Sequence, residues 1–386
     1  MNEEVPMELD EIRKEIDGID DELVRLFARR MDMSGAIAGI KRQTGKPIRD
    51  HAREREILNR VTRESGDDCA PYVRALYSHI FDLSRSYQSS QWEHRSPLAE
   101  KIARALAEPP GKHLPDHALV ACQGTEGAYA QQACEKLFAY PDILYFNRFE
   151  DVFSAVEKGM CQYGILPIEN STAGSVTQVY DLMEKHHFYI VGAQKLRIDH
   201  RLMRHRGDSP TPISEVVSHE QALRQCSRFL AAHPQITVTQ MENTAKAAEY
   251  VAECGRDDVA AIASRACADL YGLDVVNDDI SDSTNNYTRF ICISRKLEIY
   301  PQARRISLML NLAHEPGALN AVVSRLAIAG VNLVKLESRP MPDREFEFRF
   351  FFDMAASVAD PDIVRLLGEL EAHCERFVFL GCYDEQ

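Results

Sequence analysis

Long uninterrupted apolar runs are missing from this chain of 386 residues. No stretch approaches the roughly 20 apolar residues that a membrane-spanning helix needs, and residues 1–5 lack the basic and then apolar pattern of a secretory signal. We therefore expect a cytoplasmic protein. Hydrophobic residues still make up 45% of the chain, which is enough for packed cores, and the length predicts two or three domains.

Metal-ligand and disulfide spacings are also missing. The ten cysteines include no CxxC pair, and the thirteen histidines include no HExxH motif. We expect reduced thiols, no disulfide framework, and no metal or other cofactor. The formal net charge of -14 argues against nucleic acid or an anionic membrane as a partner. An anionic substrate would have to be drawn in by local basic clusters.

The first ninety residues contain an interrupted helical pattern. Apolar residues recur at steps of three and four from Leu9 to Ile40, which predicts the buried seam of one long helix. Arg30 fills the gap in this rhythm. A guanidinium is seldom buried without a partner. Either Arg30 reaches the rim of the core with its charged end in water, or an anion binds inside.

The segment after Pro71 shows the same irregularity. Its apolar face continues into Ser84 and Gln88, which lie four residues apart and stack on that face. Two helices therefore direct polar groups into one interior. A helix over residues 9–42 would be about 50 Å long at about 1.5 Å per residue. A three-helix monomer cannot cover that length, so we expect the helix to pair with a second copy of the chain.

These polar residues resemble those of the all-helical chorismate mutases. The resemblance covers residues 1–92 and implies a dimer in which two long helices intertwine and Arg13 enters the partner's site. Rearranging chorismate to prephenate is a unimolecular pericyclic step, so catalysis needs only positioning and charge stabilisation. Lys41 and Gln88 would contact the ether oxygen, and Asp50 with Glu54 the ring hydroxyl. The full set is Arg13, Arg30, Lys41, Asp50, Arg53, Glu54, Ser84 and Gln88.

A proline-rich linker, residues 93–116, separates the helical region from a stretch with another pattern. Over residues 117–296, short apolar runs alternate with helical segments, which predicts an α/β domain. The loop 124–129 is rich in glycine, yet its spacing is not GxGxxG and no phosphate-loop lysine follows. A nucleotide site in this loop is an alternative that the pattern does not favour.

A polar loop at residues 167–176 runs from a strand end into a helix. Its hydroxyl and backbone N–H groups can bind an anion, or Asn170, Ser171 or Thr172 can simply cap that helix. Residues 218–226 and 285–290 favour substrate binding, because together with the loop they resemble the prephenate dehydratases. The resemblance spans residues 117–296. It implies two α/β lobes, each like half of a periplasmic binding protein, around a substrate cleft.

The dehydratase resemblance makes Thr288 the central catalytic residue, beside the prephenate hydroxyl that leaves as water while a carboxylate leaves as carbon dioxide. Glu169 and Glu242 could each act as an acid or order the cleft, and His219 could be a general acid or a structural histidine. Cys122 and Ala130 depart from residues common in the family, which leaves the contacts of the first glycine loop open. The implied substrate-binding set is Glu169, Asn170, Ser171, Thr172, Ser218, Gln225 and Arg289.

The last unit, residues 304–386, is predicted to follow the order strand, helix, strand, strand, helix, strand, which is the ferredoxin-like plan. Two of its motifs resemble those of the ACT domains fused to prephenate dehydratases, where they form a phenylalanine site at a subunit interface. Taken alone, Gly317 could be a turn residue and Arg339 a surface charge. The implied effector-binding set is Gly317, Ala318, Leu319, Glu337, Ser338 and Arg339.

The sequence thus predicts a multidomain enzyme with an all-α mutase domain, a two-lobed α/β dehydratase domain and an α+β ACT domain. Its small-molecule substrates would be chorismate and prephenate, its effector L-phenylalanine, and its assembly a homodimer or a dimer of dimers. Two alternatives stay open. One is a non-catalytic small-molecule-binding protein, since fold does not fix function. The other is a single-activity enzyme in which one site has decayed.

Overall fold

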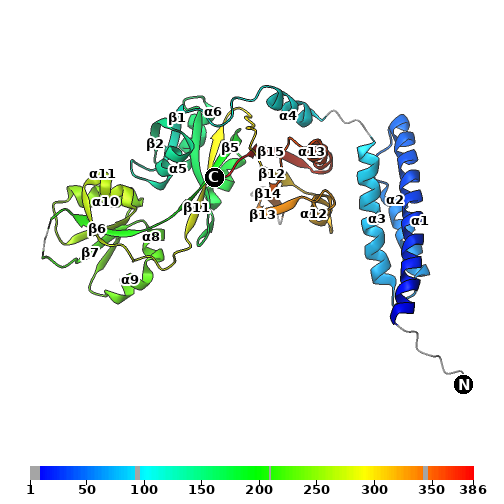
Figure 1. Ribbon diagram of the computed structural model, residues 1–386, viewed down its shortest axis with the longest axis horizontal. Coiled ribbons are helices and arrows are strands. Elements are labelled where there is room, and N and C mark those ends of the chain that lie inside the picture. Colours follow the sequence, from blue (N-terminus) through cyan, green and yellow to red (C-terminus); the bar gives the residue numbers. More distant parts are fainter. Residues whose placement is uncertain (1–8, 92–95, 208–209, 342–346) are drawn as a thin grey trace, which may run out of the picture. The chain divides into compact units, whose positions relative to one another are not determined.

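The computed structural model describes residues 9–91, 96–207, 210–341 and 347–386 (Figure 1). The chain divides into two compact units. One comprises Met1–Glu100, Ala313–Gly330 and Pro361–Cys374, and the other comprises Lys101–Leu312, Val331–Asp360 and Glu375–Gln386. In the parts of the chain that the structure describes, none of the helices is both long and apolar enough to cross a membrane.

The N-terminal part of the first unit is helical. It consists of α1 (Leu9–Thr44), α2 (His51–Glu64) and α3 (Ala70–Ser90), with α1 and α2 packed against α3, and α4 (Pro97–Ala107) follows. α1 has 36 residues, so the predicted long helix is confirmed. Its apolar seam lies mostly open to solvent: Ile19 is 58% exposed and Leu23 54%. The buried residues of α1 are Ser34 and Ala38.

Two C-terminal helices belong to the same unit. α12 (Ala318–Ile328) and α13 (Pro361–His373) both contact α3, and the Ser86 hydroxyl of α3 donates to Glu369 Oε2 at 3.0 Å. α12 begins after Gly317, whose φ of 90° lies in the left-handed region that glycine tolerates. The C-terminal helices therefore cover part of the helix that carries Ser84 and Gln88.

The second unit contains two α/β lobes. The sheet of the first lobe has the order β2-β1-β3-β11-β5, with β4 paired to β3. β2, β1 and β3 are parallel, whereas β11 lies antiparallel between β3 and β5. Helices α5 (Tyr129–Leu137), α6 (Phe149–Glu157) and α7 (Thr177–Met183) pack on this sheet. The strands are β1 (His117–Gln123), β2 (Tyr140–Phe146), β3 (Tyr163–Asn170), β4 (Gly174–Ser175), β5 (Tyr189–Arg197) and β11 (Tyr287–Ser294).

The second lobe is inserted between β5 and β11. Its sheet has the order β10-β6-β9-β7-β8, and its central strand β9 is buried throughout, as its run of apolar residues predicts. The strands are β6 (Arg201–His205), β7 (Glu215–Ser218), β8 (Thr237–Gln240), β9 (Val259–Ala263) and β10 (Leu273–Asn277). The helices are α8 (Glu220–Gln225), α9 (Ser227–Ala232), α10 (Thr244–Glu253) and α11 (Arg265–Tyr271). The predicted two-lobed α/β fold is confirmed.

A third sheet in the second unit is antiparallel, with the order β13-β14-β12-β15. Its strands are β12 (Arg305–Asn311), β13 (Asn332–Pro340), β14 (Phe348–Ala355) and β15 (Arg376–Tyr383). Along the chain the elements run β12, α12, β13, β14, α13, β15, which is the predicted order of strands and helices.

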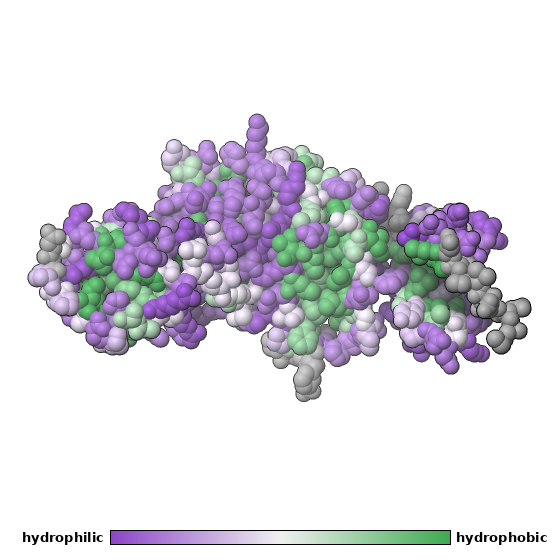
Figure 2. Space-filling model, turned by 60° about the horizontal axis from the view of Figure 1, so that its bottom comes forward, coloured by the Kyte–Doolittle hydropathy of each residue, from purple (hydrophilic) through white to green (hydrophobic). Residues whose placement is uncertain are grey.

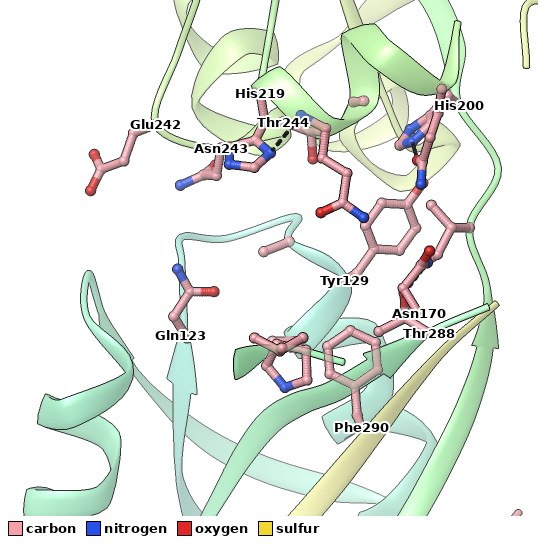
Figure 3. Close-up of a pocket in the computed structure, with 18 of the residues that line it drawn as sticks. Gln123, Tyr129, Asn170, His200, His219, Glu242, Asn243, Thr244, Thr288 and Phe290 are labelled. Carbon is pink, nitrogen blue, oxygen red and sulfur yellow. Dashed lines mark hydrogen bonds between the residues drawn. The ribbon is translucent and has the colours of Figure 1, made fainter. Parts of the chain in front are cut away.

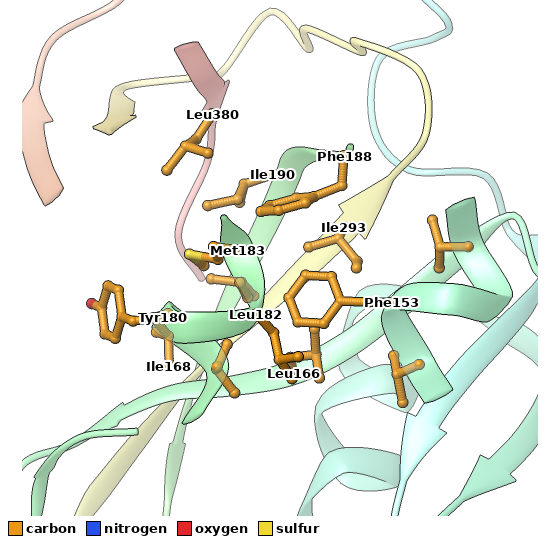
Figure 4. Close-up of a cluster of buried hydrophobic side chains, with 14 of the residues drawn as sticks. Phe153, Leu166, Ile168, Tyr180, Leu182, Met183, Phe188, Ile190, Ile293 and Leu380 are labelled. Atoms are coloured by element: carbon orange, nitrogen blue, oxygen red, sulfur yellow. The ribbon is translucent and has the colours of Figure 1, made fainter. Parts of the chain in front are cut away.

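The third sheet is fused to the first lobe. Leu380 and Tyr383 of β15 share one hydrophobic cluster with Ile168, Tyr180 and Ile190 of the lobe (Figure 4). Backbone bonds extend the contact: the Ala193 N–H donates to the Asp384 carbonyl at 2.9 Å, and the Gln386 N–H donates to the Ala193 carbonyl at 3.0 Å.

Gly381 allows this close approach, because a Cβ atom there would lie 2.1 Å from the carbonyl oxygen of Ile190. The joint is therefore a backbone contact supported by a shared core.

Apolar side chains remain exposed at the other edge of the third sheet. Val334 and Leu336 on β13 and Phe348 on β14 are each more than 40% exposed. The face of the molecule drawn in Figure 2 has a broad apolar (green) area in its middle part. Because β13 is an edge strand, it also carries unpaired backbone groups, a combination typical of a surface that pairs with another chain.

Candidate active sites

In the helical part, the structure brings Arg30 and Ser84 together. The Arg30 guanidinium donates to the Ser84 hydroxyl and lies 5.9 Å from the centre of the Phe81 ring. Partial burial lowers the pKa of Arg30 below its usual value, and Tyr77 partly opposes this shift. Arg30 thus faces the interior between α1 and α3 rather than open water. It has no carboxylate partner among the contacts of the described residues.

Gln88 lies on the same face of α3 as Ser84. Its side chain is buried, and its Oε1 atom has no hydrogen-bond partner in the described part of the chain. An unpaired buried amide oxygen costs free energy. A ligand or a second copy of the chain can satisfy it.

Lys41 lies in the last turn of α1, Asp50 directly precedes α2, and Glu54 lies in the first turn of α2. The Lys41 ammonium donates to the Ile48 carbonyl. Asp50 caps α2 by accepting from the Arg53 N–H at 3.0 Å. Glu54 is paired with Arg85 of α3 at 2.5 Å. These residues are held by local contacts on the elements that also flank Arg30.

Two predicted mutase residues lie apart from this group. Arg53 is exposed and pairs with Glu56 at 2.7 Å. Arg13 is 65% exposed on α1 and pairs with Asp10 at 3.3 Å. Within one chain, neither side chain contacts Arg30 or Ser84 in the described structure.

The second unit holds a cavity of about 380 Å³ between its two lobes (Figure 3). Gln123, Asn170, Thr288 and Phe290 enter it from the first lobe, and His219, Glu242 and Thr244 from the second. No arginine or lysine is among the described residues that line it. The other lining residues are Ala128, Tyr129, Ala130, Phe149, Pro167, Val176, Ile198, His200, Gln221, Ala222, Gln225 and Asn243.

Backbone donors fix the orientation of the Asn170 amide. Its Oδ1 accepts from the N–H groups of Thr172 at 3.0 Å and Ala173 at 2.9 Å, and from the Thr172 hydroxyl at 2.7 Å. A backbone N–H can only donate, so Oδ1 and Nδ2 cannot exchange places. Nδ2 therefore donates, to Thr288 Oγ1 at 2.9 Å and to Asn286 Oδ1 at 2.8 Å.

The direction of this network continues to a histidine. Asn286 Nδ2 donates to Gln225 Oε1 at 3.0 Å, and Gln225 Nε2 donates to Thr172 Oγ1 at 3.0 Å. Because Gln225 Oε1 is an acceptor, His200 Nε2, 2.9 Å away, must carry a hydrogen. Burial lowers the pKa of His200, although this bond and Asp199 oppose the shift. His200 is therefore neutral, with its hydrogen on Nε2.

The Thr288 hydroxyl stands at the end of the network. It accepts a hydrogen from Asn170, and among the described residues no acceptor takes its own hydrogen. Thr288 is 8% exposed and lines the cavity. Its O–H is therefore available to a ligand in the cavity.

His219 is held from the second lobe. Its Nδ1 accepts from the Gln221 N–H at 3.3 Å and so caps α8, and burial lowers its pKa. His219 and Glu242 face the cavity from the opposite side to Thr288 (Figure 3). Glu242 thus stays a candidate for an acid or for a residue that orders the cleft, and His219 stays a candidate for a general acid or for a structural histidine.

Five residues of the predicted substrate set are not among those that line the cavity: Glu169, Ser171, Thr172, Ser218 and Arg289. The Ser218 hydroxyl is fully buried and donates to the Ile262 carbonyl at 2.6 Å. Ser171 donates to the Asn285 carbonyl at 3.0 Å and accepts from the Tyr287 N–H at 2.9 Å. Arg289 and Glu169 pair with each other at 2.8 Å. The hydroxyls of Ser171, Thr172 and Ser218 are thus engaged by the protein. Arg289 differs from them, because its Nε and Nη1 are buried without a hydrogen-bond partner among the described residues.

The predicted effector residues lie on two elements. Gly317, Ala318 and Leu319 form the start of α12 in the first unit. Glu337, Ser338 and Arg339 lie on β13 in the second unit. No group of three or more potential metal-binding side chains occurs in the described parts of the chain.

Sequence reasoning missed several polar residues of the cavity network and its lining, among them Asn286, Asn243 and His200. Asn286 lies within residues 285–290, and its amide gave a signal that we did not use. His200 follows a strand end without any motif around it. Its place beside Gln225 depends on the packing of two segments, which the sequence pattern does not reveal.

Comparison with known proteins agrees with this geometry. A family model described as chorismate mutase type II matches residues 12–89, and one described as prephenate dehydratase matches residues 120–298. The bifunctional chorismate mutase/prephenate dehydratase of Escherichia coli K12 is 30% identical over 385 residues, covering 97% of this chain and 96% of that protein. The chain belongs to the bifunctional chorismate mutase/prephenate dehydratases, and it is an enzyme of phenylalanine biosynthesis with both activities.

Two further matches cover the dehydratase part. Arogenate dehydratase/prephenate dehydratase 2 of Arabidopsis thaliana is 35% identical over 276 residues, or 68% of this chain and 72% of that protein. A crystal structure of prephenate dehydratase in complex with L-Phe from Arthrobacter aurescens is 26% identical, with a TM-score of 0.63, and covers 69% of this chain and 90% of that chain.

Proposed function

We propose that Thr288 donates the proton that helps the prephenate hydroxyl leave. The observation that carries this proposal is the one-way hydrogen-bond network, which leaves the Thr288 hydroxyl hydrogen without an acceptor in the described structure. In the reaction, the bond between the prephenate ring and its carboxylate breaks, the bond between the ring and its hydroxyl oxygen breaks, and the ring becomes aromatic. Carbon dioxide, water and phenylpyruvate form, and one proton is consumed. A donor placed at the leaving oxygen lowers this barrier.

The two carboxylates of prephenate would be held without a salt bridge. No cationic side chain is among the described lining residues, but α5 and α10 begin at the cavity with Tyr129 and Thr244. Helix N-termini present free N–H groups and the positive end of the helix dipole, which favour anions. Gln123 and Asn243 add neutral donors. Phe290 and Phe149 provide apolar surface for the ring.

The test of the dehydratase proposal uses Thr288→Ala and Thr288→Ser with supplied prephenate. We expect phenylpyruvate formation, followed by absorbance in alkali, to be lost in the alanine variant and partly kept in the serine variant. Prephenate binding without turnover by the wild-type chain would support the alternative of a non-catalytic binding protein. Mutase activity, assayed on chorismate, reports whether the chain is folded. A chain with mutase activity but no dehydratase activity has a decayed dehydratase site, whereas a misfolded chain lacks both activities.

For the mutase, we propose that each site combines Arg30, Lys41, Glu54, Ser84 and Gln88 of one chain with Arg13 of a second. Arg13 lies on the exposed seam of α1, apart from Arg30. Pairing two α1 helices would bury that seam, which supports a homodimer as the working form. Desolvation in the dimer would strengthen the attraction between the arginines and the substrate carboxylates.

We further propose that the C-terminal part is an ACT domain through which L-phenylalanine inhibits the dehydratase. The order of its elements supports this. The structure from Arthrobacter aurescens, described as a complex with L-Phe, matches 69% of this chain, more than residues 120–298 alone can supply. Exposed apolar residues on edge strand β13 support a contact between two such domains, and hence a dimer or a dimer of dimers.

Gly317→Val tests the effector proposal, because a branched side chain does not tolerate the φ of 90° at that position. We expect inhibition to weaken while turnover without phenylalanine stays. The measurement is dehydratase rate against phenylalanine concentration. Unchanged inhibition in a folded variant would place the effector elsewhere, most simply in the cavity as a competitor.

A further inference from the structure

Strands β3 and β11 present two different pairs of side chains on their two faces. Thr288 is paired in register with Asn170, and Arg289 with Glu169. Successive side chains of a strand point to opposite faces of the sheet. Thr288 and Phe290 line the substrate cavity, whereas Arg289 and Ile291 face the third sheet. Thr288 and Asn170 therefore have an ion pair behind them on the opposite face of the sheet. It is formed by their chain neighbours, Arg289 and Glu169.

Arg289 is the buried centre of an ion cluster whose carboxylates are partly exposed. It is 5% exposed. Its Nη2 donates to Asp353 of β14 at 2.6 Å, its Nε lies 2.8 Å from Glu169, and its Nη1 lies 3.6 Å from Glu385. Burial would lower the pKa of Arg289, but the carboxylates outweigh burial and raise it. Two of its three carboxylate partners belong to the third sheet or to the residues that follow β15.

A second connection starts from β13, the strand that carries the predicted effector residues. The Lys335 ammonium of β13 donates to Glu169 and, at 3.0 Å, to Ser175. The Ser175 hydroxyl in turn donates to Glu337 at 2.8 Å. Glu169 therefore joins Arg289 on one side and β13 on the other.

From this geometry we infer that Arg289 and Glu169 are positioning residues, which hold the backs of β11 and β3 against β14 and β13 and so set the position of Thr288 and Asn170. Their charges are matched by Asp353 and Lys335 on the third sheet. The inference rests on the proposed roles of Thr288 and Asn170. It replaces the expectation that Arg289 and Glu169 bind substrate.

The cluster suits this task for a physical reason. A charge removed from water is stable only with partners in good geometry, so a shift of β13 or β14 must move Glu169 and Arg289 or leave them unpaired. Because Glu169 and Arg289 are the chain neighbours of Asn170 and Thr288, such a shift reaches the hydrogen bond between these two residues. Binding of an effector to β13 would thereby change turnover.

The experiment compares Asp353→Asn and Lys335→Met with the wild type in the full chain. Neither residue lines the cavity, and both substitutions keep approximate size. We expect the dehydratase kcat to fall about fivefold or more, with KM within about twofold, as for energetically coupled contacts. Arg289→Lys, which keeps the charge but not the forked geometry, should have the same signature. In the double variant of Arg289→Lys and Asp353→Asn, the effects should be less than multiplicative.

Arg256→Gln is the matched control. Arg256 also joins two carboxylates, Glu215 at 2.7 Å and Asp258 at 2.9 Å, but within the second lobe and away from the cavity. We expect the dehydratase kcat of Arg256→Gln to equal that of the wild type. Circular dichroism and the mutase activity of each variant report whether the chain is folded.

The inference is overturned if Arg289→Lys raises KM while Asp353→Asn and Lys335→Met keep wild-type kinetics, since Arg289 would then act on substrate. It is also overturned if the effects of Arg289→Lys and Asp353→Asn multiply independently. The effector proposal has a separate readout. We expect the phenylalanine midpoint to shift about fivefold in Lys335→Met. If phenylalanine never inhibits the wild type, that proposal fails while the kcat comparison still decides the positioning role.

Discussion

The helical part and the two-lobed part of this chain differ in where their sites are completed. α1 leaves Ile19 and Leu23 more than half exposed, and Arg13 lies apart from Arg30. In the two lobes, by contrast, Thr288, Asn170, Asn286 and Gln225 meet within one chain, in a network with every direction fixed.

This difference follows from the two folds. The long helix α1 has more apolar length than its neighbours cover, which supports the proposed pairing with another copy. An α/β lobe covers its sheet with its own helices, and two lobes enclose a cavity without help. We therefore expect the mutase to depend on assembly and the dehydratase to depend on the internal order of one chain.

The largest expected effect separates the two activities. Thr288→Ala removes the donor for the leaving hydroxyl, so dehydratase kcat should fall about 100-fold or more, within the range for lost acid–base assistance. Chorismate mutase activity should stay at the wild-type level. The check is a steady-state assay of both reactions on one preparation. Thr288→Ser, which keeps the hydroxyl, should recover much of the rate; equal loss in both variants would argue against the donor role.

The converse change is Arg30→Ala. It removes a charge-assisted contact that contributes roughly 1.5–3 kcal/mol, so mutase activity should fall about tenfold or more while dehydratase activity on supplied prephenate stays. Arg29→Ala is the control, because Arg29 is the exposed neighbour on the same helix. A wild-type mutase rate for Arg30→Ala would show that Arg30, which interrupts the apolar seam of α1, has no role in catalysis.

Mixing chains tests the shared site directly. If Arg13 acts in the partner's site, Arg13→Ala and Arg30→Ala chains exchanged in equal amounts should regenerate about a quarter of the wild-type sites, as expected for a symmetric dimer. The measurement is mutase activity before and after exchange, with light scattering to establish the dimer. Exchange without recovery would mean that both arginines serve the same chain's site.

Gly381→Ala tests the joint between the third sheet and the first lobe. The added Cβ would meet the Ile190 carbonyl at 2.1 Å, so we expect unfolding to become easier by about 1–3 kcal/mol, as for overpacked sites. Gly207→Ala is matched, because Gly207 also has a positive φ but open space around it. Equal denaturant midpoints for the two variants would show that the close approach is not maintained in solution.

The smallest expected effect is the contribution of His200 to the pH dependence of stability. Burial lowers the pKa of His200 in the folded state, whereas an unfolded histidine titrates near 6.5. As the pH falls below about 6.5, the histidine of the unfolded chain takes up a proton before the folded one does. The free energy of unfolding should therefore decrease by up to about 1.4 kcal/mol for each unit by which the pH falls. Denaturation at pH 7.5 and 5.5 should show less of this loss in His200→Gln than in wild type. His205→Gln, at an exposed position, should behave like wild type.

Much of the fold was predictable because it depends on local pattern. The spacing from Leu9 to Ile40 predicted α1, and the alternation of short apolar runs with helices predicted the α/β lobes. For the dehydratase cavity, Asn170, Thr172, Gln225 and Thr288 were all selected and all join one network.

The selected residues that do not line the cavity share one feature. A motif names neighbours along the chain but not the face of the sheet that each side chain takes. Thr288 and Arg289 are adjacent in one motif, yet they point to opposite faces. Ser218 was selected because residues 218–226 resemble a family motif, yet its hydroxyl donates to the Ile262 carbonyl. Only the packed structure reveals which polar groups are already satisfied.

The fixed direction of the cavity network also limits how protons move. Amide groups do not ionise near neutral pH, so Asn170, Asn286 and Gln225 can orient one another but cannot pass a proton along the chain that they form. In the proposed mechanism, the Thr288 hydroxyl therefore receives no replacement proton through these amides. The proton that each turnover consumes would have to reach Thr288 from the open side of the cavity, which would make the supply of water there part of the proposed cycle.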